Sequence, residues 1–254
     1  MVDAATTAIL FTSGVLAGAM NAVAGGGTFV ALPALMLTGI SPTVANASTT
    51  VALFPGTLAS SWAYRHNVEP LEGTSGALLL AFSITGGLTG ALLLLSTSES
   101  AFGMIIPWLL LLATITFAIG PSGAGRLRQL GLSFGSRSIY AAQFTLGVYG
   151  GYFGGAVGLM MLAAWGLAST ADLRAMTPLR TVMVAAINGT AVLCFAAAGT
   201  VAWWQCIVVM IGGVVGGYIG ARFALKLSNA VLRGLVLSIS GITTIAFFAR
   251  TYFV

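Results

Sequence analysis

The chain alternates between long apolar stretches and short polar ones along its whole length. Each apolar stretch is long enough to cross a bilayer core of about 30 Å as a helix. Helices are expected because the edge of an open sheet would leave backbone groups unsatisfied in lipid. The pattern predicts an all-α polytopic membrane protein with apolar stretches at residues 4–40 and 139–169, both interrupted by glycines, and at 42–63, 74–96, 101–119, 177–198, 201–221 and 230–249.

The composition supports this fold class. Hydrophobic residues make up 58% of the chain and charged residues only 6%, whereas soluble domains carry about 25% charged residues. The first stretch does not resemble a signal peptide, because its leading segment MVDAATTA contains Asp3 as its only charge and signal peptides begin with basic residues.

Charge and cysteine content exclude several other classes of function. We interpret the net charge of +5 as the excess of Lys and Arg that cytoplasmic loops carry, not as a surface for nucleic acid. Cys194 and Cys206 have neither CxxC spacing nor clustered histidines, and His66 lies in a polar loop. We therefore expect no metal, cofactor or disulfide framework.

Both halves of the chain contain a similar glycine-rich segment. Residues 14–27 read GVLAGAMNAVAGGG, residues 147–160 read GVYGGYFGGAVGLM, and the same order of apolar stretches follows each. At an offset of 133 they share Gly14/Gly147, Val15/Val148, Gly18/Gly151 and Gly25/Gly158. Because internal repeats are typical of secondary transporters, we expect a first membrane repeat at 1–120, a linker at 121–138 and a second membrane repeat at 139–254.

The positive charges favour one topology. With Arg180 set aside as intramembrane, the basic residues would divide five against four between the two faces if each glycine-broken stretch crossed the membrane once. If each is instead a hairpin or discontinuous helix pair that enters and leaves by one face, followed by three transmembrane helices, the division is eight against one, as the positive-inside rule expects. The eight are Arg65, Arg126, Arg128, Arg137, Arg174, Arg222, Lys226 and Arg233, and the one is Arg250.

This second topology makes the two repeats inverted relative to each other, because each contains an odd number of full crossings. It places the 121–138 linker in the cytoplasm and both termini on the outer side. We expect a multi-pass protein of a bacterial inner membrane.

The glycine breaks are candidate binding elements. Backbone without helical hydrogen bonds is tolerated at membrane depth only where it is buried in protein or lines a cavity, and helix N-termini at such breaks suit anions. The candidates are Gly25, Gly26 and Gly27, with Asn21 one turn earlier, and Gly154, Gly155 and Gly158. The alternative role of glycine, close helix packing, is expected for TGGLTG at 85–90 and IGGVVGGYIG at 211–220.

Three polar side chains within apolar stretches are further candidates. Asn46 and Asn188 could each contact a ligand or bond a neighbouring helix. Arg180 could snorkel to the membrane surface or face the transport pathway as a counter-charge. No Asp or Glu lies inside an apolar stretch, which is compatible with an anion pathway.

The sequence resembles the sulfite exporter TauE/SafE family, also called the TSUP permeases. The resemblance rests on AG-x-x-N-x-x-AGGG at 17–27, on Pro33 with Leu35, and on G-x-x-P-x-x-ANA-S at 39–48. GGYFGGAVG at 150–158 and the Asn188 segment extend it over nearly the whole chain. Where many members read Asn-Ala-Leu-Lys, this chain has AMTPLR at 175–180, with Arg180 in place of the lysine.

The resemblance implies transport of small sulfur-containing anions, either sulfite or sulfonates such as sulfoacetate. Repeats around a midplane break favour alternating access, while an anion channel is the alternative. A membrane-embedded enzyme would need a nucleophile and base or metal ligands at depth, and the apolar stretches contain no His, Asp or Glu. Coupling could use a protonated substrate or Na⁺.

Overall fold

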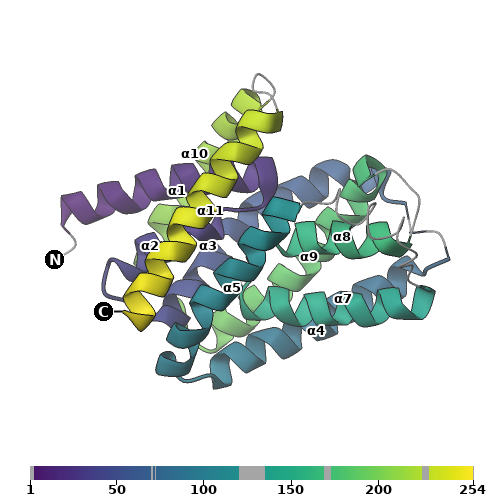
Figure 1. Ribbon diagram of the computed structural model, residues 1–254, viewed down its shortest axis with the longest axis horizontal. Helices are drawn as coiled ribbons and strands as arrows, with labels where there is room; N and C mark the ends of the chain where they lie inside the picture. Colours follow the sequence, from purple (N-terminus) through teal and green to yellow (C-terminus); the bar gives the residue numbers. More distant parts are fainter. Residues whose placement is uncertain are drawn as a thin grey trace.

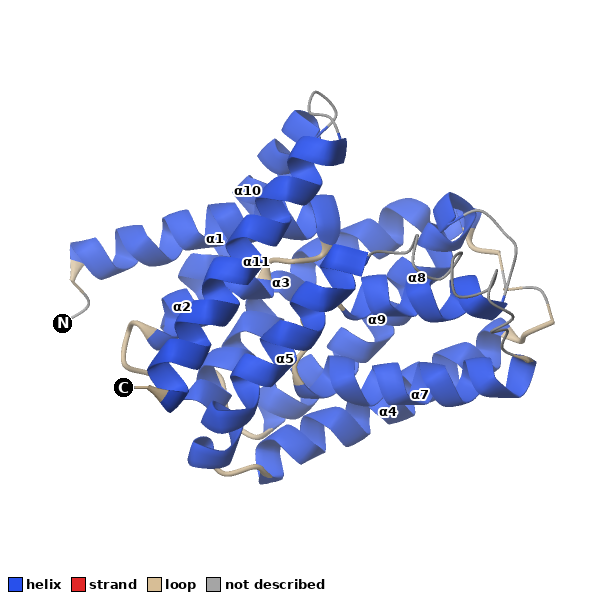
Figure 2. Ribbon diagram, viewed as in Figure 1, coloured by secondary structure: helices blue, strands red, loops and turns tan. Residues whose placement is uncertain are grey.

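The described part of the computed structural model is helical (Figures 1 and 2). The structure describes residues 3–69, 71, 73–119, 135–168, 173–224 and 229–253, and this part of the chain contains no strand. The helices of the first half are α1 (Ala4–Ala24), α2 (Thr28–Met36), α3 (Pro42–Tyr64), the short η1 (Arg65–Asn67), α4 (Gly76–Ser96) and α5 (Glu99–Ile119). Those of the second half are α7 (Ser136–Tyr152), α8 (Val157–Ala168), α9 (Leu173–Ala197), α10 (Trp203–Ala224) and α11 (Asn229–Tyr252).

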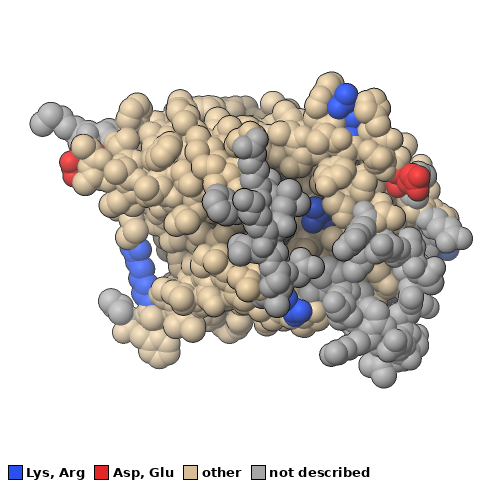
Figure 3. Space-filling view, turned by 90° about the horizontal axis from the view of Figure 1, so that it is seen from above, with Lys and Arg blue, Asp and Glu red and all other residues tan. Residues whose placement is uncertain are grey.

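Six of the described helices are long and apolar enough to cross a membrane, namely α1, α4, α5, α9, α10 and α11. Large apolar side chains such as Leu92, Ile242 and Ile245 are exposed on their outer faces. The face shown in Figure 3 is mostly uncharged, with few acidic or basic groups among its described atoms. These features confirm the predicted polytopic membrane protein, because an outward apolar surface is stable only against lipid.

Close contact between glycines and backbone joins α1 to α10. A β-carbon built on Gly14 would lie 3.0 Å from Cα of Val209, and one on Gly212 would lie 3.1 Å from Cα of Gly14. Gly18 lies in the same way against Gly213 further along both helices. Lipid gives helices no hydrophobic reason to associate, so small residues that bring two backbones together supply the packing.

The same kind of glycine contact joins α7 of the second half to α4 of the first half. A β-carbon on Gly86 would lie 2.9 Å from Cα of Gly147, and the backbone carbonyl of Gly87 lies against Gly151. The packing role predicted for the TGGLTG and IGGVVGGYIG segments is therefore confirmed. The glycine pairs Gly14/Gly147 and Gly18/Gly151, which match between the repeats, make equivalent contacts with the backbone of a neighbouring helix.

Contacts between the halves occur in matching pairs. Alongside the α1–α10 and α7–α4 pairs, α3 packs on α10 as α9 packs on α4, and α2 meets α11 as α8 meets α5. Two further pairs, α3 with α9 and α5 with α11, join equivalent helices of the two halves. This matching supports two copies of one structural plan.

The two broken helix pairs point in opposite directions along the molecule. Both termini lie at the left end of Figure 1, where α1 begins and α2 ends, while α7 begins and α8 ends at the right. The arms are unequal, since α1 has 21 residues and α2 has 9, while α7 has 17 and α8 has 12. The orientation of this arrangement in a membrane stays a prediction, and most of the 121–138 linker lies outside the described residues.

Candidate functional site

The first break turns the chain through a left-handed residue. Gly25 ends α1 with φ of 75° and donates its N–H to the carbonyl of Asn21 at 3.0 Å. Glycine adopts this conformation without the steric cost that other residues pay. Gly27 then precedes the first residue of α2, Thr28.

The second break has a different local structure. The chain leaves α7 at Tyr152, Gly154 has φ of 84°, and Ala156 has φ of 60° just before α8. A positive φ is uncommon for alanine. The structural counterpart of Gly25 is therefore Gly154, whereas Gly158, which the sequence match pairs with Gly25, lies in the first turn of α8.

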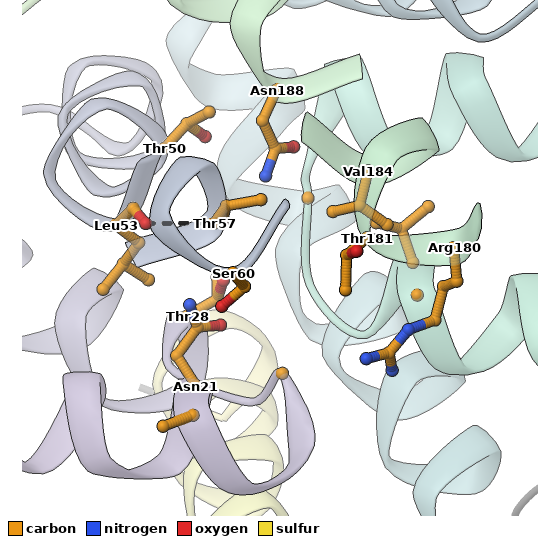
Figure 4. Close-up of a pocket in the computed structure, with 15 residues that line it drawn as sticks. Asn21, Thr28, Thr50, Leu53, Thr57, Ser60, Arg180, Thr181, Val184 and Asn188 are labelled. Carbon is orange, nitrogen blue, oxygen red and sulfur yellow. Dashed lines mark hydrogen bonds between the residues drawn. The ribbon is translucent and has the colours of Figure 1, made fainter. Parts of the chain in front are cut away.

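A cavity of about 120 Å³ borders both breaks. Figure 4 shows side chains of the first half on one side of this space and side chains of the second half on the other. The first half contributes Asn21, Ala22, Gly25, Thr28, Thr50, Leu53, Thr57 and Ser60, and the second half contributes Gly154, Val157, Gly158, Arg180, Thr181, Val184 and Asn188. One water needs about 10–15 Å³ of such space, so the cavity can hold a small solute.

Arg180 supplies a positive charge to this cavity. It lies on α9 and is half-buried, and its side chain packs over Gly158. Within the described part of the chain, no acidic side chain forms an ion pair with it. A guanidinium that is partly buried without a carboxylate partner is ready to bind an anion.

The two asparagines have different surroundings. The amide oxygens of both are buried without a hydrogen-bond partner among the described residues, but of the two only Asn188 lines the cavity. Asn46 is fully buried away from the cavity, and its amide nitrogen donates to the backbone carbonyl of Tyr152 at 3.0 Å. Asn46 therefore bonds the end of a neighbouring helix, and Asn188 is the asparagine of the two that a solute in the cavity can reach.

Not every candidate glycine lies at the cavity. Gly26 packs against the side chains of Phe117 and Met20, and Gly27 packs against Leu53 and the carbonyl of Ala17. Gly155 is covered by the neighbouring ring of Phe153. Of the ten candidates, the cavity brings together Asn21, Gly25, Gly154, Gly158, Arg180 and Asn188.

Hydroxyl groups of α3 form a wall of the cavity that our sequence reasoning missed. Thr50, Thr57 and Ser60 line it, seven and then three residues apart. This spacing places them on one face of a helix. Hydroxyls at helical spacing in an otherwise apolar stretch are the sequence signal that could have identified this wall.

A buried polar cluster holds the second break in place. Gln143 of α7 is fully buried, donates to the hydroxyl of Ser83 of α4 at 2.7 Å, and accepts from the indole N–H of Trp165 of α8 at 3.2 Å. Each of these bonds joins different helices. Because a satisfied network in a low-dielectric interior is stable, the cluster fixes α8, and with it Gly158, relative to α7.

Comparison with known proteins finds one family model and several probable membrane transporters that are similar to this chain. The family model described as sulfite exporter TauE/SafE matches residues 10–247. The chain is 27% identical over 249 residues to the probable membrane transporter protein YfcA of Escherichia coli K12, covering 95% of this chain and 89% of that protein. It is 28% identical over 238 residues to a probable membrane transporter protein of Haemophilus influenzae, covering 93% and 92%. No solved structure is significantly similar to it.

Proposed function

Because the chain belongs to the sulfite exporter TauE/SafE family of membrane transporters, we propose that it moves small sulfur-containing anions across the inner membrane of a bacterium. The proposed substrates are sulfite or an organosulfonate such as sulfoacetate. The proposed mechanism is alternating access at the cavity between the two halves.

The observation that carries this proposal is the position of Arg180. Its charge borders a cavity that both chain breaks also border, at Gly25 and Gly154. Charged side chains inside membrane segments are costly and are usually retained for function. An arginine can hold two oxygens of an oxyanion at once through its planar guanidinium.

The rest of the lining suits the same kind of ligand. Thr28 offers a hydroxyl donor, and Asn188 offers an amide. The hydroxyls of Thr57 and Ser60 donate to the backbone carbonyls of Leu53 and Gly56 and would have to rotate to donate to an anion. The first residues of α2 and α8 also border the cavity, and helix N-termini attract anions through their free N–H groups and dipoles. These donors would replace the hydration shell that the anion loses.

Alternating access is favoured over a channel by the way the cavity is built. Its first wall comes from α1–α3, of which α1 and α3 pack on α10, and its second wall comes from α8 and α9, of which α9 packs on α4 beside α7. Movement of one of these two bundles against the other would change access to the site without dismantling either wall. A carrier that works in this way saturates with substrate and exchanges it across the membrane. A channel would show neither counterflow nor saturation in the same concentration range.

Flux into proteoliposomes tests the proposal. The purified protein is reconstituted, and uptake of sulfite, sulfate, thiosulfate and sulfoacetate is measured with and without gradients of pH and Na⁺. We expect saturable flux of a sulfur-containing anion that is accelerated by the same anion on the opposite side. A dependence on either gradient would identify H⁺ or Na⁺ as the coupling ion.

Protein-free liposomes and liposomes containing the Arg180→Ala variant are the controls. Flux of sulfur-containing anions no faster than in protein-free liposomes would contradict the proposed function. Flux without saturation or counterflow would favour the channel.

A further inference from the structure

The cavity contains more positive charge than Arg180 alone supplies. Among the described residues that line it, Arg180 is the single ionisable side chain. Two helices also begin at this space, α2 with Thr28 and α8 with Val157 and Gly158. A helix N-terminus acts as about half a positive charge, so the two helix ends and the guanidinium together approach about two positive charges.

An independent feature shows that the α2 end is equipped for a ligand. Thr28 is only 7% exposed, yet its hydroxyl lines the cavity and has no hydrogen-bond partner in the described part of the chain. A hydroxyl that opens onto the cavity without a protein partner is free to donate a hydrogen bond to a group that binds there.

None of the described residues that line the cavity carries a negative charge to offset these groups. Resting on the function proposed above, we infer that this cavity is built for a doubly charged oxyanion and discriminates against singly charged anions of the same shape. A dianion can place two of its oxygens against the guanidinium of Arg180 and another oxygen against a helix N-terminus. A monoanion with a methyl group in place of that oxygen leaves one set of donors unpaired, and specificity of this kind is strong.

Two pairs of probes of matched shape separate charge from size. Sulfite and methanesulfinate are both pyramidal, and sulfate and methanesulfonate are both tetrahedral. Within each pair the second compound has a methyl group where the first has an oxygen, and it carries one negative charge instead of two. Binding to the detergent-purified protein is measured by calorimetry at a pH where sulfite is doubly ionised.

We expect the dianion of at least one pair to bind about ten- to a hundredfold more tightly than its methyl analogue, which is the loss expected for one charge-assisted hydrogen bond. In Arg180→Gln, which keeps the helix ends and removes one charge, this preference should fall about tenfold or more. A merely structural role for Arg180 would instead weaken both members of a pair equally.

Equal or tighter binding of the methyl analogues in both pairs would overturn the inference while leaving anion transport intact. Failure of every sulfur oxyanion to bind would overturn the proposed function itself. The two failures are therefore distinguishable in one set of titrations.

Discussion

The side chain of Arg180 lies directly over Gly158. A β-carbon built on Gly158 would be 3.4 Å from Cδ and 3.7 Å from Nη1 of Arg180. Gly158 is in the first turn of α8 and Arg180 is on α9, so the second chain break and the charge of the cavity are in contact. A side chain larger than a methyl group at Gly158 would occupy the space through which the guanidinium reaches the cavity.

This contact predicts a graded effect of side-chain size at Gly158. Gly158→Ala should bind sulfite nearly as the natural protein does, because its β-carbon would make ordinary van der Waals contact with Arg180. Gly158→Val should displace the guanidinium and weaken binding about ten- to a hundredfold. Calorimetry measures both, and equal affinities for the two variants would show that Gly158 does not position Arg180.

Arg180 itself should be required for its shape as well as its charge. Arg180→Ala should weaken anion binding about ten- to a hundredfold, the loss of one charge-assisted hydrogen bond. Arg180→Lys should restore it only in part, because lysine keeps the charge but lacks the planar fork.

A snorkelling Arg180 would give a different result in these titrations. Lysine would then serve as well as arginine, and alanine would lower stability or membrane insertion more than affinity. An unchanged affinity in a folded Arg180→Ala protein would mean that the anion is held elsewhere.

Asn46 and Asn188 form a matched pair of substitutions. Asn46→Ala should lower the free energy of unfolding by about 1–3 kcal/mol, because it leaves the partly buried carbonyl of Tyr152 without the donor from Asn46. Asn188→Ala should leave stability closer to that of the natural protein and weaken anion binding, because Asn188 lines the cavity. Thermal unfolding in detergent and calorimetry measure the two effects, and the reverse outcome would contradict both assignments.

Two adjacent glycines of α10 test the packing against α1. Gly216 lies against the backbone carbonyl of Val15, whereas a β-carbon on Gly217 would lie 3.8 Å from the nearest atom, the carbonyl oxygen of Gly18. Gly216→Ala should therefore lower the melting temperature, because overpacking costs about 1–3 kcal/mol. Gly217→Ala should leave it unchanged or raise it, since alanine favours a helix by up to about 1 kcal/mol over glycine. Equal melting temperatures for the two variants would contradict the α1–α10 contact.

The topology predicts opposite accessibility for the linker and the termini. Single cysteines at Ser122 and at Phe253, introduced after Cys194 and Cys206 are replaced by alanine, should react with impermeant reagents from different sides of the membrane. The linker cysteine should react from the cytoplasm and the C-terminal cysteine from outside, as the charge division indicates. Reaction of both from one side would contradict the inverted repeat.

The elements of this fold follow from local sequence. Long apolar stretches predict helices because only helices satisfy their backbone within lipid, and the observed helices match the predicted stretches closely. Glycines spaced for helix packing also predict their own role, because a small residue repeated on one helix face needs a close neighbour.

Local sequence could not show which of the polar residues and break glycines line the cavity. Asn46 and Asn188 are both single amides in apolar stretches, and only the packing of α3 against α7 and α9 shows that one bonds Tyr152 and the other lines the cavity. Gly25 and Gly26 are neighbours, yet the positive φ of Gly25 turns the chain so that Gly25 borders the cavity and Gly26 faces Phe117.

The sequence by itself therefore determined the helices, the packing glycines and the presence of a charge at Arg180 within an apolar stretch, because each depends on short-range pattern and on the chemistry of lipid. Only the tertiary structure decided which groups meet around the cavity. The hydroxyls of α3 and the helix ends at Thr28 and Val157 come from segments far apart in the chain. Their position around one cavity depends on how the two halves pack, and no local sequence pattern predicts this packing.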